Sequence, residues 1–167
     1  GIKAIKMPGG QHKLNDEYFK RIEALNFTLE HDDGQNIETI TKAEIILVGV
    51  SRTSKTPTCI YLANQGIKAA NIPLVPNQDL PKLDKNKNLT VIALITTPQN
   101  LVEVRKKRAI ELGLDPKKDE YTNINSVTKE IDDAKRLFNK MGWPTIDTTR
   151  RSVEETAAAI MSIRAQE

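Results

Sequence analysis

The chain has 167 residues, of which 38% are hydrophobic and 28% are charged, and its formal net charge is +3. This length suits a single domain whose core is large enough to fold without disulfides or a structural metal, and the ordinary composition argues against a disordered protein. We expect neither a membrane protein nor a nucleic-acid-binding protein, because no apolar run approaches the ~20 residues of a membrane-spanning helix and aromatic residues for base stacking are few.

The start of the chain does not resemble a signal peptide, and Cys59 is the only cysteine. A single cysteine excludes an intramolecular disulfide and a metal site built on cysteines. Both observations fit a reducing compartment, and we therefore expect a cytoplasmic protein.

Apolar residues at steps of three and four predict a first helix from residue 15 or 16 to about residue 30. A turn signal with two acids and a glycine follows at 31–34. The apolar run 45–48 predicts a buried strand. A second helix is expected from about Pro57, because proline is tolerated in the first turn of a helix.

The remainder of the chain alternates between strand and helix patterns. These patterns predict a strand at 70–75, a strand at 89–95, a helix from 98 to 113, a helix at 126–141, a strand at 143–148 and a last helix from the capping box at 152–155. Pro73 falls inside a predicted strand, which indicates a sheet edge or a strand end. The alternation predicts an α/β fold, a P-loop kinase-like parallel sheet flanked by helices on both faces.

The segment between the first strand and the second helix follows the phosphate-binding P-loop pattern G-x-x-x-x-G-K-[ST]. Its residues are Gly49, Val50, Ser51, Arg52, Thr53, Ser54, Lys55 and Thr56. Backbone N–H groups of such a loop form a concave anion site, in which Lys55 can reach phosphate oxygens and the Thr56 hydroxyl can bind Mg²⁺. The alternative is a basic turn before a helix. Because a strand and a helix flank the loop in the right order, we expect a nucleotide or phosphate site.

Ser54 stands where this pattern has its second glycine. If the backbone there needs a positive φ, serine costs on the order of 1 kcal/mol relative to glycine.

A second candidate site is the turn that contains His31, Asp32 and Asp33. Two adjacent carboxylates beside a histidine can act as a general base and a metal ligand. Aspartate and glycine are also common in solvated turns that end helices, and the residues alone favour this simpler interpretation.

Two further candidates lie at the predicted strand ends, where open α/β sheets bind ligands. Segment 147–152 offers two arginines that could complement phosphate, although it could also be a capped helix with solvated arginines. Segment 96–99 has no acid for a Walker-B role, and Asp147 is the nearest substitute. The basic run 105–108 is expected to be the solvated face of a helix, with docking of an acidic protein partner as the alternative.

Together these motifs resemble the C-terminal catalytic domain of the pyruvate, phosphate dikinase regulatory proteins, also called the phosphoenolpyruvate synthase regulatory proteins. The resemblance covers nearly the whole chain and is carried by the segments 10–12, 17–24, 31–34, 49–58, 61–63, 66–71 and 152–158. It implies a bifunctional enzyme that uses ADP as phosphoryl donor to phosphorylate, and so inactivate, a threonine of the dikinase or the synthase. It also implies the reverse step, a phosphorolysis with inorganic phosphate as acceptor and pyrophosphate as product.

The resemblance implies roles for the candidate residues. The P-loop would hold the phosphates of ADP in one direction and phosphate or pyrophosphate in the other, with Lys55 needed for both and Mg²⁺ bound at Thr56. Asp32 or Asp33 would be the base for the target threonine, and His31 could orient that acid.

Full-length members of the family usually carry a further N-terminal region, so we expect residues 1–167 to form one kinase/pyrophosphorylase domain without it. The residues leave two other functions open, an ATP-dependent small-molecule or nucleotide kinase and a non-catalytic nucleotide-sensing module. A homodimer is plausible for a P-loop enzyme of this size, and the sequence does not select between the two target enzymes.

Overall fold

The computed structural model describes residues 10–83 and 88–167. Its α-helices are α1 (Gly10–Glu30), α2 (Lys55–Asn64), α3 (Pro98–Glu111), α4 (Ile124–Met141) and α5 (Val153–Ala165). Its strands are β1 (Ile45–Val50), β2 (Ala69–Leu74), β3 (Thr90–Ile95) and β4 (Thr145–Asp147). The described residues also form the short 3-10 helices η1 (Asp32–Gly34), η2 (Ile37–Lys42) and η3 (Glu120–Thr122).

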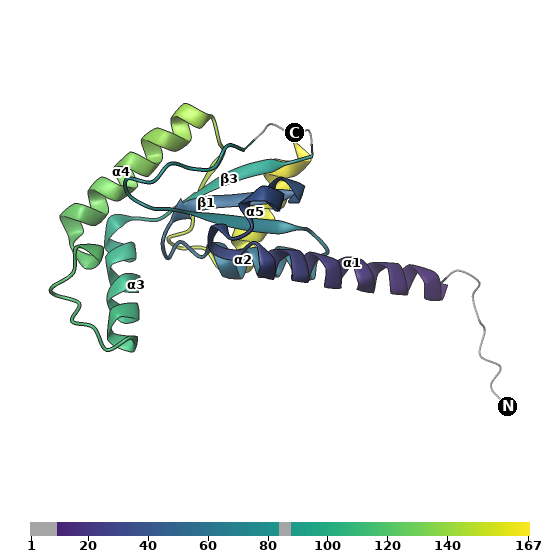
Figure 1. Ribbon diagram of the computed structural model, residues 1–167, viewed down its shortest axis with the longest axis horizontal. Coiled ribbons are helices and arrows are strands. Elements are labelled where there is room, and N and C mark those ends of the chain that lie inside the picture. The colour runs from purple at the N-terminus through teal and green to yellow at the C-terminus, as the bar shows by residue number, and fades with distance from the viewer. Residues whose placement is uncertain (1–9, 84–87) are drawn as a thin grey trace.

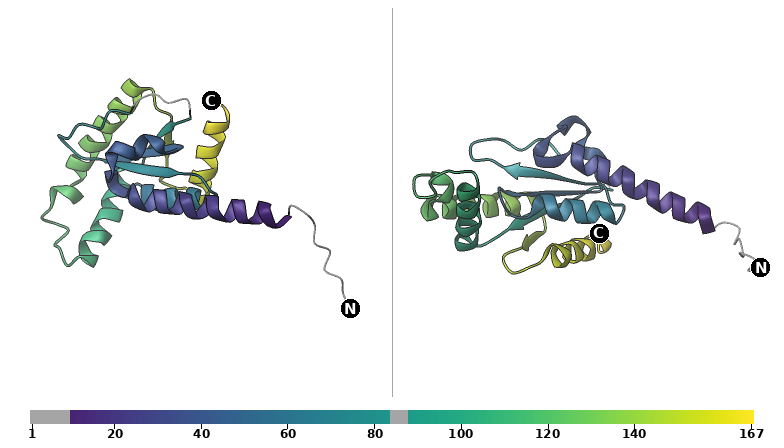
Figure 2. Two further views of the ribbon diagram at one scale, coloured as in Figure 1. Left: turned by 45° about the vertical axis from the view of Figure 1, so that its right-hand side comes forward. Right: turned by 90° about the horizontal axis from the view of Figure 1, so that it is seen from below.

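The strands form one parallel sheet in the order β2-β1-β3-β4, with helices on both faces (Figures 1 and 2). The predicted α/β fold is therefore confirmed. All residues of β1 are buried, as expected for the centre of a parallel sheet that is covered on both sides. Pro73 lies in β2, and β2 is an edge strand, where a residue without an N–H is tolerated.

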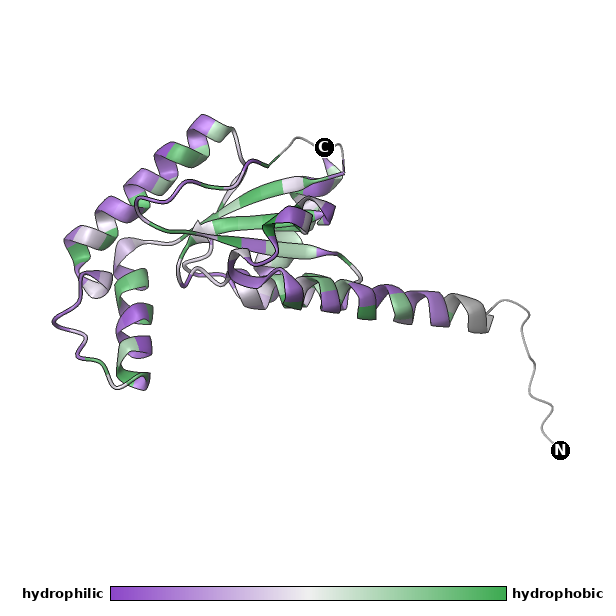
Figure 3. Cartoon of the chain, viewed as in Figure 1, coloured by the Kyte–Doolittle hydropathy of each residue, from purple (hydrophilic) through white to green (hydrophobic). Residues whose placement is uncertain are grey.

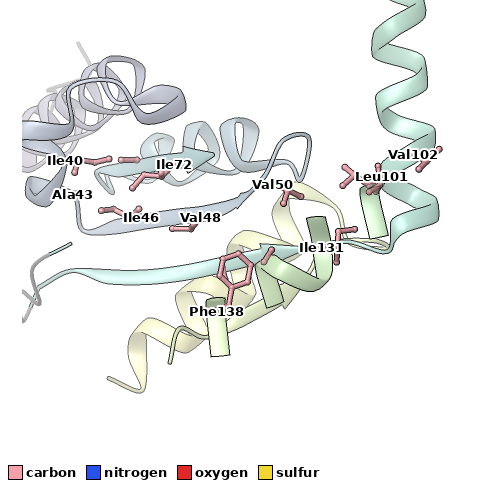
Figure 4. Packing of buried hydrophobic residues seen from close by; sticks show 14 residues of the cluster. Ile40, Ala43, Ile46, Val48, Val50, Ile72, Leu101, Val102, Ile131 and Phe138 are labelled. Carbon is pink, nitrogen blue, oxygen red and sulfur yellow. The ribbon is translucent and has the colours of Figure 1, made fainter. Parts of the chain in front are cut away.

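One core lies between the sheet and α4. Ile46, Val48 and Val50 of β1 belong to it, together with Ile131 and Phe138 of α4 (Figure 4). Successive strand residues point to opposite faces, so every second residue of β1 contributes to this core. The hydrophobic colouring of the strands in Figure 3 agrees with a sheet buried from both sides.

A second core lies on the opposite face, between the sheet and the helices α2 and α5. It contains Ile45 and Leu47 of β1, Cys59 and Leu62 of α2, and Ile160 of α5. Cys59 is a buried free thiol, and burial raises its pKa, so this thiol remains protonated and serves as packing.

Several boundaries differ from the sequence prediction. The helix η2 occupies a stretch with no predicted element, and its Ile40 is buried in the α4-side core. The helix α2 begins at Lys55 rather than near Pro57. The helix α4 begins at Ile124 because the side chain of Asn123 caps it by accepting hydrogen bonds from the N–H groups of residues 125 and 126.

The N-terminal part of α1 extends beyond the sheet (Figures 1 and 2). Residues 14–23 are exposed there, and burial begins at Ala24, where α1 approaches α2 and β2. Within residues 10–83 and 88–167, none of the helices combines the length and the apolarity that crossing a bilayer requires.

Candidate functional site

A cleft of about 480 Å³ opens at the carboxyl end of the sheet, beside the loop that joins β1 to α2. One side is formed by the segment 51–57 together with Asp33 and Pro73. The other side is formed by Val104, Arg108, Ala109, Leu112, Leu114, Asp119 and Tyr121. Of the predicted P-loop, residues 51–56 therefore line the cleft, while Gly49 and Val50 lie behind it in β1.

Gly49 permits a close approach between β1, β3 and the loop. A Cβ atom at this position would lie 2.7 Å from the Leu94 carbonyl oxygen and 2.8 Å from Thr53 Oγ1. The first of these atoms belongs to the backbone of a central strand and cannot move aside easily. Packing against β3 therefore requires the first glycine of the loop pattern.

The loop contains two non-glycine residues in the left-handed region, Arg52 with φ 71° and Ser54 with φ 64°. Ser54 is the N-cap residue of α2, but its side chain makes no capping hydrogen bond. Its carbonyl oxygen instead accepts a hydrogen bond of 2.7 Å from the Thr58 hydroxyl. Such strain is typical of ligand-binding loops, and the serine occupies the conformation that glycine would adopt at lower cost.

Lys55 is the first residue of α2 and folds back onto its own loop. Only 5% of its surface is exposed, and Nζ donates to the Val50 carbonyl oxygen at 2.7 Å and to Thr53 Oγ1 at 3.4 Å. Burial lowers the pKa of this ammonium group to about 8, and the nearby negative charge of Asp33 partly opposes that shift. An anion in the cleft would supply the countercharge that these neutral partners lack.

Asp32 joins the turn η1 to the start of α2. Its Oδ1 accepts a hydrogen bond of 2.8 Å from the Thr56 hydroxyl and one of 2.6 Å from Asn71 Nδ2. Asn71 lies in β2, and its side-chain oxygen accepts a hydrogen bond of 3.1 Å from the backbone N–H of Asp33. Asn71 therefore fixes both acidic residues against the edge of the sheet, a role that the sequence did not reveal.

Asp32 and Thr56 are the residues that could hold a metal ion. Their two oxygen atoms lie 2.8 Å apart and are the hard donors that Mg²⁺ prefers. No group of three or more His, Cys, Asp and Glu side chains that could hold a metal ion occurs in the described part of the chain. One carboxylate and one hydroxyl fit Mg²⁺, because this ion usually keeps several waters and completes its coordination with substrate phosphates.

Asp33 faces the cleft. It is exposed, has a left-handed backbone with φ 50°, and its carboxylate accepts no hydrogen bond from the described residues. Its negative charge raises the pKa of Lys55 and is the strongest influence on that pKa after burial, which lowers it. Of the two predicted acids, Asp33 therefore presents its carboxylate to a ligand in the cleft, whereas Asp32 is engaged by Thr56 and Asn71.

His31 is turned away from both carboxylates. The ring is buried, with Nδ1 2.7 Å from the Phe27 carbonyl oxygen and Nε2 2.7 Å from Thr39 Oγ1, and it stacks on the Phe27 ring. Because a carbonyl oxygen can only accept, Nδ1 carries a proton. His31 contacts the site through its backbone, whose carbonyl oxygen accepts a hydrogen bond of 3.4 Å from Asn71 N–H.

The expectation that residues 105–108 form a solvated basic face is wrong for Arg105, which is 1% exposed. Its guanidinium forms a bidentate ion pair with Glu130 at 2.8 and 2.9 Å. It also donates to the Ser51 carbonyl oxygen at 3.3 Å and lies 4.3 Å from the centre of the Tyr121 ring. The spacing could have revealed this burial, because Arg105 follows buried Leu101 by one helical turn.

The two sheet-edge candidates form one self-contained cluster outside the cleft. The Thr149 hydroxyl bonds to Asp147, to Thr96 Oγ1 at 3.1 Å and to the N–H of Thr97 at 3.0 Å. Arg150 and Arg151 belong to no ion pair that the structure records for the described residues, and both are exposed. This cluster connects the end of β3 to the end of β4, and β3 lies between β1 and the strand that contains Asp147.

Comparison with known proteins identifies the family to which this arrangement belongs. A family model described as kinase/pyrophosphorylase matches residues 1–161. A protein of Pelagibacter ubique is 56% identical over 163 residues, one of Bradyrhizobium diazoefficiens is 53% identical over 156 residues, and one of Caulobacter vibrioides is 51% identical over 164 residues. Each of these relatives bears, provisionally, the name pyruvate, phosphate dikinase regulatory protein.

The matches cover 96%, 93% and 98% of this chain but only 59%, 56% and 52% of the respective relatives. The chain thus spans little more than half the length of the relatives that it matches. The resemblance inferred from the motifs is confirmed over nearly the whole sequence, and this chain belongs to the kinase/pyrophosphorylase family.

Proposed function

We propose that this domain is the catalytic unit of a bifunctional enzyme that phosphorylates and dephosphorylates a threonine of pyruvate, phosphate dikinase. In the forward direction it transfers the terminal phosphoryl group of ADP to the threonine hydroxyl and releases AMP. In the reverse direction inorganic phosphate attacks the phosphothreonine, which releases the threonine hydroxyl and pyrophosphate. The names of the relatives support the dikinase as target, and a cytoplasmic location fits this function.

The observation that carries this proposal is the convergence of Lys55 and Asp33 on one cleft. A cation within the phosphate loop supports binding of the nucleotide phosphates. The Asp33 carboxylate accepts no hydrogen bond from the residues that the structure describes, and this supports general-base catalysis because it can accept the proton of a threonine hydroxyl. Asp32 serves a different purpose in this proposal, since it and Thr56 would hold Mg²⁺.

Bound Mg²⁺ would supply neutralisation of phosphate charge. The chain's own groups do the remaining work. Backbone N–H groups of the loop and the Lys55 ammonium orient the β-phosphate of ADP, and Asp33 takes the threonine proton as the oxygen attacks phosphorus. His31 keeps the turn in place through its buried ring and backbone, so its contribution is that of a positioning residue.

The reverse reaction needs a second phosphate group in the same cleft. Arg108 lines the wall opposite the loop, and its recorded ion pair is a half-exposed contact of 3.4 Å with Glu111. Such an exposed pair is weak, so the guanidinium is available to an anion. A cleft with cations on both walls supports binding of phosphate and phosphothreonine side by side, without the positioned water that a phosphatase requires.

The test uses purified dikinase with phosphate on its catalytic histidine. This chain is added with Mg²⁺ and ADP, threonine phosphorylation is measured by mass spectrometry, and phosphate is then added and pyrophosphate assayed. We expect threonine phosphorylation with ADP, followed by its removal with equimolar pyrophosphate. Use of ATP and no labelling of the protein would instead indicate a small-molecule kinase.

Two variants distinguish an enzyme from a nucleotide-sensing module. Asp33→Asn should lower the rate of threonine phosphorylation by about 10²–10⁴-fold while ADP still binds, because the variant lacks the base. Asp132→Asn is the matched control, since Asp132 is an exposed acid on α4 outside the cleft. ADP binding without turnover in the unsubstituted chain would refute catalysis by this domain alone.

A further inference from the structure

The buried side chain of Arg105 links the α3 wall of the cleft both to α4 and to the phosphate loop. Arg105 comes from α3 and Glu130 from α4, and the guanidinium also donates to the carbonyl oxygen of Ser51, the first loop residue that lines the cleft. Tyr121 completes the arrangement, because its hydroxyl lies 3.0 Å from Ser51 Oγ and its carbonyl oxygen accepts from Arg105 at 3.2 Å. Both the side chain and the backbone of Ser51 are therefore held by the opposite wall.

Stability alone is a poor explanation for this ion pair. Removing a guanidinium and a carboxylate from water carries a desolvation cost that their attraction often only balances. Replacing such a pair by apolar residues of similar volume therefore often leaves a protein equally stable or makes it more stable. Arg105 also leaves its Nε without a hydrogen-bond partner among the described residues, which adds to that cost. What apolar residues could not supply is a fixed, directional donor for Ser51.

We propose that Arg105 is a positioning residue for the phosphate loop. Glu130 orients the Arg105 guanidinium, and Tyr121 assists Arg105 in holding the loop. The Arg105 guanidinium fixes the position of Ser51. Through Ser51 it also fixes the strained turn at Arg52 and Ser54, which precedes Lys55. The same pair fixes α3, so that Arg108, three residues farther along that helix, faces the loop across the cleft. The expected effect of Arg105 on ligand affinity rests on the proposed function. Its expected effect on the conformation of the loop does not depend on any activity.

The test compares Arg105→Lys with Arg136→Lys by hydrogen exchange and by titration with pyrophosphate and with ADP. Lysine keeps the charge at residue 105 but cannot form the bidentate pair and reach Ser51 at once. Arg136 is the matched control, because it forms an exposed ion pair with Asp133 on α4. We expect faster exchange at residues 51–54 and about tenfold weaker pyrophosphate binding for Arg105→Lys, with neither change for Arg136→Lys.

Tyr121→Phe keeps the ring beside Arg105 and removes only the hydroxyl next to Ser51. Tyr121→Phe should accelerate hydrogen exchange in the loop and weaken pyrophosphate binding by about threefold, while the melting temperature stays unchanged. If Arg105→Lys does not fold, Tyr121→Phe alone tests the proposed positioning of the loop. Exchange and affinity that stay at the unsubstituted values in every folded variant would overturn the proposal. If exchange changes but the unsubstituted chain binds neither pyrophosphate nor ADP, the proposed function fails and the positioning of the loop stands.

Discussion

The fold alters the acid–base chemistry of Lys55. In the free protein its ammonium group is buried against a carbonyl oxygen and a hydroxyl, and its pKa falls to about 8. A bound polyphosphate would stabilise the charged form and raise this pKa. Binding should therefore take up a proton at a pH above about 8, where the free lysine is partly neutral.

We predict that ADP affinity falls by about tenfold between about pH 8 and about pH 9.5, because the free lysine loses its proton over this range while ADP remains fully ionised. Isothermal titration calorimetry in buffers of different ionisation enthalpy measures both the affinity and the proton uptake. Cys59 does not contribute, since burial raises the pKa of its thiol. An affinity that is flat over this range would show that Lys55 does not bind the phosphates in its charged form.

Ser54 offers a second test at a single position. Its side chain makes no capping hydrogen bond, so Ser54→Ala should change the free energy of unfolding by no more than about 0.5 kcal/mol. Ser54→Gly should be about 1 kcal/mol more stable than Ser54→Ala, because only glycine adopts the positive φ without strain. Denaturant unfolding of the two variants provides the comparison, and equal stability would mean that the left-handed conformation is not strained.

The elements of the fold could be predicted from the sequence where a pattern repeats within one segment. The buried strands β1 and β3 and the amphipathic helix α4 follow directly from apolar periodicity. The strand before the predicted loop and the helix after it are likewise present, as β1 and α2. The helix η2 could not be predicted, because a short 3-10 helix has no repeating pattern. The burial of Arg105 was missed because its charge suggested a solvent-exposed side chain. Its spacing from Leu101 nevertheless placed it on the buried face of α3.

The junction between β1 and the loop provides a prediction about packing. Gly49→Ala should lower the free energy of unfolding by about 3 kcal/mol, because the new methyl group would collide with the Leu94 carbonyl oxygen of the neighbouring strand. Gly113→Asn is a suitable control, since nothing lies within 4 Å of a Cβ there and asparagine tolerates its positive φ. Thermal unfolding of both variants measures the difference. If Gly49→Ala destabilised the protein no more than Gly113→Asn does, the close approach of β3 to Gly49 would be contradicted.

In the whole molecule, the candidate site is assembled from segments far apart in the sequence. The turn with Asp33, the loop with Lys55, and the wall from α3 to η3 meet at one end of a four-stranded sheet. The sequence predicted the loop and the acidic turn but could not show that they face the same cleft, because that depends on strand order. It also could not distinguish the two acids, whose carboxylates differ because that of Asp32 accepts hydrogen bonds from Asn71 and Thr56.

The central claim is that one cleft performs both phosphorylation with ADP and phosphorolysis with phosphate. The most direct measurement is the rate of both reactions for Lys55→Ala, with Lys135→Ala as control, because Lys135 is an exposed lysine on α4 outside the cleft. We predict that Lys55→Ala slows threonine phosphorylation and pyrophosphate release alike, each by about 10²-fold or more, while Lys135→Ala changes neither. If Lys55→Ala spared either reaction, the two directions would not share a phosphate site.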